Sequence, residues 1–220
     1  MVEMASDHVS QDIDWEGTED VMHKLLLAEC RFITKHALGN CGVGTTLVQL
    51  KFQQDASCPW CGAIEDTCHV YRCVGSDAST SWNDNIQNLE GYLDNTDTDP
   101  ELSHALIFSL MCWQESKPID LHTTHASLHP AVRLQHNIRW KNLLEGLAGS
   151  HWWQAQYCYY QQHRKQKSSH CWLQGTLLCL ARLGRGQRLH RNDDIHTKSR
   201  PCHKRANALM QHALIWLYMR

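Results

Sequence analysis

The chain has 220 residues, of which 42% are apolar, and this is enough for one ordinary domain or two small ones. No apolar run approaches the ~20 residues of a membrane-spanning helix, and the acidic N-terminus lacks the apolar segment of a signal peptide. We therefore expect no membrane association and a location in the cytoplasm or the nucleus. The chain has eleven cysteines, an odd number, and we find no secretory signal. Both observations favour metal binding and free thiols over disulfides.

Charge is distributed unevenly along the chain, although the net charge is only -2. Residues 1–20 contain seven acids and no Lys or Arg, whereas residues 133–220 contain fifteen Lys or Arg and three acids. A basic C-terminal part indicates a polyanionic partner, such as RNA or DNA. The alternative is a solvated basic tail without a partner, and charge alone does not decide between the two.

The N-terminal third begins with a polar, aperiodic stretch, and we expect residues 1–17 to be a disordered acidic tail. A helix is predicted over residues 18–38, because apolar residues recur there at helical spacing and Thr18 is a suitable N-cap. A second, short helix is predicted over residues 45–52. With the cysteine-rich stretch that follows, residues 18–75 are expected to form a helical and zinc-binding module.

Residues 76–165 are predicted to be a helical region that starts with a linker of small residues at 76–81. Asp99 as N-cap and Pro100 as first residue begin another helix, and further helices follow near residues 130 and 152. The apolar residues of the first helix recur at helical spacing: Trp82, Ile86, Leu89 and Leu93.

The C-terminal part is harder to interpret. Residues 166–220 mix Gly and Arg into the apolar pattern, so we expect a basic, poorly patterned tail that ends in an amphipathic helix over residues 206–219. No alternation long enough for a sheet occurs in the chain. The fold class is therefore predicted to be mostly α, with a small Cys3His zinc module packed on a helix and followed by several amphipathic helices.

One tight cluster of metal-binding residue types stands out, at Cys58, Cys61, His69 and Cys73. A Cys-x2-Cys pair wraps a tight turn so that both sulfurs face one metal, and residues four apart share one face of a helix. The four side chains can close a tetrahedron around zinc without an open position for water. This pattern predicts a structural zinc site rather than a catalytic one.

Two alternatives to this ligand set remain open. Cys68 could replace His69 in a four-cysteine site, although the four-residue spacing of His69 and Cys73 gives the better helical geometry. A redox Cys-x-x-Cys would need a βαβ context, which is missing.

The adjacent carboxylates Asp193 and Asp194 lack the flanking strands of a polymerase site, so we predict no catalytic residues and no enzymatic activity.

The surroundings of the cysteines resemble the zinc-binding region downstream of the reverse transcriptase and ribonuclease H modules of eukaryotic retroelements. The resemblance lies in residues 31–44, in Cys-Pro-x-Cys-Gly at 58–62 and in Glu-Asp-Thr-x-His-Val-x-Arg-Cys at 65–73. It covers residues 20–165 and weakens at 177–188, where Gly and Arg replace an expected Trp-rich apolar helix. Further matching positions are Trp82, Leu89, Leu93, 94–101, 129–132, Trp140, Gly146, Trp152 and 190–192.

This resemblance implies a non-catalytic fragment of a retrotransposon polyprotein that assists reverse transcription by gripping RNA or DNA. The polymerase region of the same element is a second expected partner. The alternatives are a zinc-stabilised protein–protein interaction module and an element relic without function. Aromatic stacking beside basic residues is how single strands are held, and the candidate contacts are Trp60, Tyr71, Arg72, Arg164, Lys165 and Lys167. Trp60 and Tyr71 are equally suited to packing over the metal.

Overall fold

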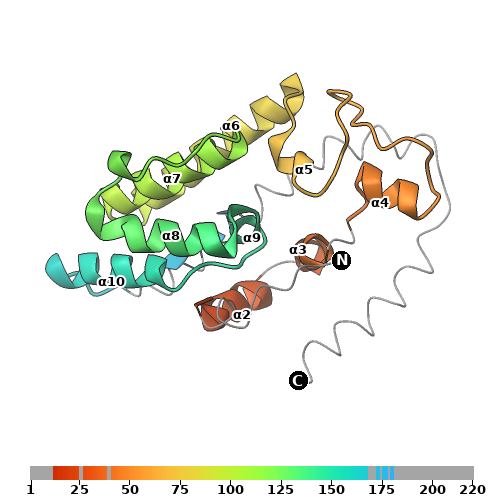
Figure 1. Ribbon diagram of the computed structural model, residues 1–220. Helices are drawn as coiled ribbons and strands as arrows, with labels where there is room; N and C mark the ends of the chain where they lie inside the picture. Colours follow the sequence, from red (N-terminus) through yellow and green to blue (C-terminus); the bar gives the residue numbers. More distant parts are fainter. Residues whose placement is uncertain are drawn as a thin grey trace. The chain divides into compact units, whose positions relative to one another are not determined.

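The computed structural model of the protein describes residues 12–24, 27–38, 41–167, 172–173, 175–177 and 179–180. Over these ranges the chain is mostly helical, as predicted, and β-structure is limited to two isolated bridges. None of the helices in these ranges is long and apolar enough to cross a membrane. The helices are α2 (Trp15–Lys24), α3 (Leu27–Ala37), α4 (Gly44–Gln49), α5 (His69–Arg72), α6 (Ser76–Asn95), α7 (Pro100–Gln114), η1 (Leu121–Thr123), η2 (Ala126–Leu128), α8 (His129–Ile138), α9 (Trp140–Leu144) and α10 (His151–Gln162) (Figure 1).

The main hydrophobic core lies among α6, α7, α8 and α10. Helix α6 packs on α7, and α10 packs on both α7 and α8 (Figure 1). The rings of Trp140 and Trp152 meet edge to face, 6.2 Å apart between centroids. Burying an aliphatic or aromatic side chain stabilises the fold by about 1.5–3 kcal/mol, and the core holds Trp82, Ile86, Leu89, Leu93, Leu102, Leu106, Leu110, Leu143 and Leu144. The apolar face predicted from Trp82 to Leu93 is thus confirmed.

The predicted linker at residues 76–81 is wrong, because these residues form the first turns of α6. Ala78 is buried one turn before Trp82, so the helical apolar face extends through the small residues. Gly75 precedes the helix in extended conformation, and a Cβ at this position would lie 2.8 Å from Trp60 Cβ. The start of α6 is therefore fixed by packing against the cysteine-rich segment.

The turn between α6 and α7 is held by α10. The Asp99 side chain accepts a hydrogen bond from the amide of Glu101, as its predicted role of N-cap requires. The side chain of Gln156 on α10 accepts from the Asp99 amide at 3.0 Å and donates to the Asp97 carbonyl at 3.2 Å. Tyr160 donates to the Thr96 carbonyl at 3.2 Å. Helix α10 thus satisfies the polar backbone of a turn far from it in sequence.

The N-terminal expectation needs correction at residues 12–17. Ile13 is buried and forms a bridge with Gly149, and α2 begins at Trp15 rather than at residue 18. Asp14 caps this helix, because its carboxylate accepts from the Gly17 amide at 3.0 Å. Thr18 lies inside the helix, and its hydroxyl reaches the carbonyls of Asp14 and Gly146. Two helices, α2 and α3, replace the single predicted one, and residues 1–11 lie outside the described residues.

The expected boundary at residue 166 also needs correction. Trp172, Leu173, Leu177 and Leu180 are buried in the main core, and the Trp172 indole donates to the Thr98 hydroxyl at 2.7 Å. These apolar residues recur at helical spacing, and the Gly and Arg residues that obscured the pattern come after them. The predicted helix over residues 206–219 lies outside the described residues.

Candidate metal centre

The two-cysteine turn is closed by backbone hydrogen bonds. The Gly62 amide donates to the Cys58 carbonyl at 2.8 Å, and the Cys58 amide donates to the Ala63 carbonyl at 2.7 Å. Gly62 has a φ of 74°, which glycine adopts without the steric cost that a side chain would bring. Ser57 and Ile64 bridge at the base of the turn. Cys58 and Cys61 are therefore presented from one tight loop.

The second pair of residues is placed by α5. The carboxylate of Asp66 accepts from the amides of Cys68 and His69, at 2.9 and 2.7 Å, and so starts the helix. His69 is its first residue, and Cys73 directly follows its last. One helical turn therefore separates His69 from Cys73, as their spacing predicts.

The four predicted residues come together in the structure. The ligand atoms of Cys58, Cys61, His69 and Cys73 all lie within 4.8 Å of one another. The sulfurs of Cys58 and Cys73 are 3.7 Å apart, and Cys61 Sγ lies 3.3 Å from His69 Nε2. A tetrahedral ion about 2.3 Å from two thiolates would separate them by about 3.8 Å. The cluster is therefore close enough to bind one metal ion, with three sulfurs and one imidazole nitrogen as donors.

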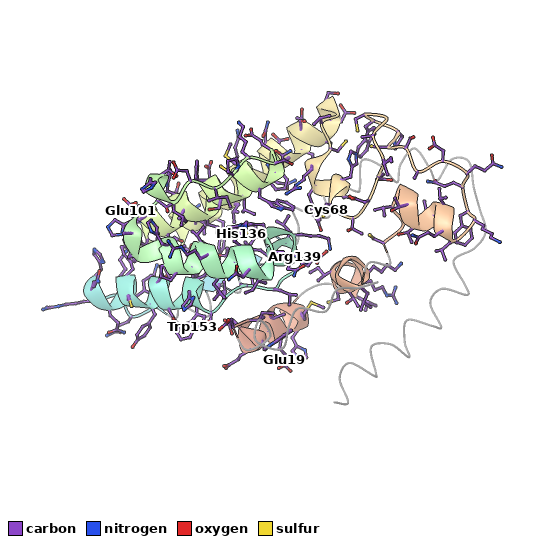
Figure 2. All side chains as sticks on the ribbon, in the orientation of Figure 1. Glu19, Cys68, Glu101, His136, Arg139 and Trp153 are labelled. Carbon is purple, nitrogen blue, oxygen red and sulfur yellow. The ribbon has the colours of Figure 1, made fainter. Side chains whose placement is uncertain are left out.

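Cys68 is not part of this cluster. It directly precedes α5 (Figure 2), and the group of close ligand atoms contains His69 instead. Burial, with the nearby charge of Asp66, raises the pKa of the Cys68 thiol. The geometry thus favours the Cys3His set over the four-cysteine alternative.

The thiols differ in how readily they ionise. Burial, together with the neighbouring thiols of Cys58 and Cys61, raises the pKa of Cys73 to about 12. Burial acts in the same direction on Cys61, but hydrogen bonds from the Ala63 amide and from the thiols of Cys73 and Cys58 outweigh it and lower its pKa. Thiolates this close repel one another strongly, so a cation bound between them would stabilise the ionised form of these thiols.

Two contacts behind the ligands join the module together, and sequence reasoning did not assign them a role. The side-chain carboxylate of buried Glu65 accepts a hydrogen bond from the Gly44 amide at 2.8 Å. The backbone carbonyl of Glu65 accepts another from the Thr45 amide at 2.9 Å. A Cβ on Gly44 would lie 2.4 Å from the Ala56 carbonyl oxygen. The start of α4 is thereby fixed beside the loop that carries Cys58. Both Glu65 and Gly44 lie inside the matching sequence segments, which was the available signal.

The aromatic and basic residues predicted next to the metal have different surroundings. Trp60 packs against the buried cluster of Cys58, Cys73 and Ala78. Part of its side chain stays exposed to solvent. Tyr71 is only 1% exposed and its ring lies 6.1 Å from that of Trp113. The prediction that Tyr71 contacts nucleic acid is therefore wrong, because no ring face is available for a base.

Arg72 and two of the distant basic residues, Lys165 and Lys167, contact other side chains of the protein. The Arg72 guanidinium lies over the Trp113 ring, 4.5 Å from its centroid. Lys165 lies 3.5 Å from the Asp97 carboxylate, and Lys167 pairs with the same carboxylate. These two lysines lower the pKa of Asp97, Lys167 most strongly. Arg164 is exposed. In the described part of the chain, the side chains of Lys165 and Lys167 contact Asp97 and the ring of Tyr159, away from the metal ligands.

The case for a metal site rests on the distances among the three thiols and the imidazole. The retroelement resemblance remains an interpretation of residues 31–44 and 58–73. No protein-family model, no curated protein and no solved structure matches the chain.

Proposed function

We propose that the chain is a non-catalytic accessory module of a reverse-transcribing element, that a zinc ion stabilises it, and that it binds RNA or DNA in the cytoplasm or nucleus. The observation that carries the proposal is the closeness of four ligand atoms, all within 4.8 Å of one another. Three sulfurs and one imidazole are a donor set that suits zinc. Four protein ligands leave no open position for water or substrate, which supports a structural role.

The nucleic-acid part of the proposal rests on residues away from the ligands. Trp60 keeps part of its surface exposed beside the metal cluster, where a base can stack. Arg164 is exposed, and it stands next to Lys165 and Lys167, whose two positive charges meet one carboxylate. The polymerase region of the same element is the protein partner that the resemblance implies.

Metal content tests the zinc site. We expect the purified protein to contain one zinc ion per chain by elemental analysis, and Cys58→Ser to lose most of it together with its cooperative unfolding transition. Cys158→Ser is the matched control, because Cys158 is exposed and lies outside the cluster. Cys68→Ser should retain the metal and His69→Ala should not. A wild-type protein without zinc would overturn the proposal.

Salt dependence tests nucleic-acid binding. Affinity for a single-stranded RNA or DNA oligonucleotide should fall steeply as salt rises, because phosphate contacts release counterions. Replacing Arg164, Lys165 and Lys167 together by Ala should weaken binding about tenfold or more and flatten the salt slope. Asp97→Asn should strengthen binding, because it frees both lysines and Asn tolerates the φ of 55° at this position. Lys117→Ala is the control, because Lys117 is likewise ion-paired but lies outside this basic stretch. Salt-independent binding would contradict this part.

A protein-interaction function is the second candidate, and the apolar surface of the metal module favours it. Leu50, Phe52, Ile64 and Val74 have exposed fractions of 59, 63, 71 and 79%. Exposed apolar side chains concentrated in one module are typical of a docking surface. If this module docks onto its polymerase, a Phe52→Ser and Ile64→Ser double variant should lose that binding and keep its affinity for RNA. A double variant that loses its affinity for RNA and keeps its binding to the polymerase would favour nucleic acid as the partner of this surface.

A further inference from the structure

A cavity of about 330 Å³ lies beside α8, away from the metal ligands. It is formed by the segment that follows α7 and by the outer side of α8. Cavities of about 300–1,000 Å³ are typical of ligand sites in proteins. None of its lining residues belongs to the metal centre or to the predicted nucleic-acid contacts.

The floor of this cavity is aliphatic. It is lined by Ile119 and Leu121 from the segment and by Val132 from α8. Val132 is buried in the main core, and Ile119 and Leu121 are partly buried against that core. Because core packing fixes these three side chains from behind, the floor is preformed and suits an aliphatic group.

The rim is polar and carries an arginine. Arg133, His136 and Asn137 line the cavity from the exposed side of α8, where Figure 2 labels His136. Their spacing of three and four residues places them on one helical face. In the described part of the chain, no side-chain hydrogen bond or ion pair engages any of the three. Arg133 thus offers its guanidinium donors, and Asn137 an amide donor, at the mouth of the cavity.

Arg133 is the one residue with a permanent positive charge among those that line the cavity. Lys117 is already paired with Glu115, and Asp120 is engaged because its carboxylate accepts the His122 amide at 2.9 Å. Asp120 does not line the cavity, although both its neighbours do. The planar fork of the Arg133 guanidinium matches the two oxygens of a carboxylate.

We propose that this cavity binds the C-terminal residue of a partner polypeptide when that residue is aliphatic. Its side chain occupies the floor, and its terminal carboxylate accepts hydrogen bonds from Arg133 and Asn137. Val132 and Arg133 line the same cavity, so a ligand that fills it presents an apolar group to the floor and an anionic group to the rim. A C-terminal Leu, Ile or Val does so within a single residue. Capture of a terminal carboxylate is a known mode of peptide recognition.

Fluorescence anisotropy on the full chain tests this proposal. The probe is a short fluorescein-labelled peptide of small polar residues that ends in Leu with a free carboxylate. We expect saturable binding, and about tenfold or more weaker binding for the same peptide with a C-terminal amide or with Ser in place of Leu. Equal binding of the amide peptide, or no binding of the free acid at millimolar concentration, would overturn the proposal.

Variants locate the site. Arg133→Gln should weaken binding of the free-acid peptide about tenfold and leave the weak binding of the amide peptide unchanged. Asn137→Ala should weaken binding to a smaller extent, and because both residues are exposed, circular dichroism and zinc content should match those of the wild type. Arg164→Gln is the control, as an exposed arginine outside the cavity. Unchanged affinity in Arg133→Gln, or equal losses in Arg164→Gln, would place the peptide elsewhere.

Discussion

Single thiols of the metal centre hold protons that a metal ion has to displace. Burial raises the pKa of Cys73 to about 12, so this thiol is protonated at neutral pH before the metal binds. We expect zinc addition in weakly buffered solution at neutral pH to release roughly one or more protons per site. Apparent zinc affinity should fall as the pH is lowered, because protons compete for the sulfurs. Zinc binding without proton release would contradict the thiolate assignment.

Residue roles were predictable from the sequence where their causes are local. The ligand set followed from a tight two-cysteine turn and a four-residue helical spacing, and the structure brings those four side chains together. The burial of Tyr71 was not predictable in this way, because it depends on Trp113 from another helix. The engagement of Lys165 and Lys167 depends equally on Asp97, which stands far from them in the chain.

At the scale of elements, the contact between α10 and the α6–α7 turn gives a testable stability effect. Replacing buried Gln156 by Ala leaves the Asp99 amide and the Asp97 carbonyl without their side-chain partners. We expect a loss of about 1–3 kcal/mol in the free energy of unfolding, measured by urea denaturation. Gln162→Ala on the exposed end of the same helix should change it by less than about 0.5 kcal/mol. Equal effects of both substitutions would argue against this role of Gln156.

Helix starts were predictable where their capping signals were local and explicit. Asp99 followed by Pro100 placed the start of α7 correctly. The start of α2 was not predictable, because its acidic surroundings resemble a disordered tail, and its packing depends on contacts with residues far along the chain, such as the bridge of Ile13 to Gly149. The composition of the small residues before Trp82 predicts a linker, but they are the first turns of α6, where Ala78 is buried against Cys58 and Cys73.

At the scale of the whole molecule, the core extends beyond residue 166, because it includes Trp172, Leu173, Leu177 and Leu180. Leu177 is fully buried, so Leu177→Ala should lower the free energy of unfolding by about 2–5 kcal/mol. Leu27 is 65% exposed, and Leu27→Ala should change it by less than about 0.5 kcal/mol. Chemical denaturation of both variants, with zinc present, measures the difference. A Leu177→Ala protein as stable as the wild type would restore the boundary at residue 166.

The mostly helical class could be predicted because apolar periodicity is a local property. Which helices share a core could not, because that depends on contacts between distant segments. Trp172, whose indole reaches Thr98, is such a case, and periodicity alone gave no sign of its partner. The same holds for the cavity beside α8, since its floor combines residues from two elements.

The pairing of the N-terminal segment with the α9–α10 connection sets an order for the synthesis of this protein. The Asp14 amide donates to the Ala148 carbonyl, and Ile13 packs with Leu134 and Ile138. A ribosome that adds about 5–20 residues per second needs on the order of ten seconds to make these partners after Ile13 has emerged. During that interval α2 has no site on which to dock. Helix α2 is therefore translated well before the segment on which it packs, and it reaches its native position only after residues 134–149 have been made.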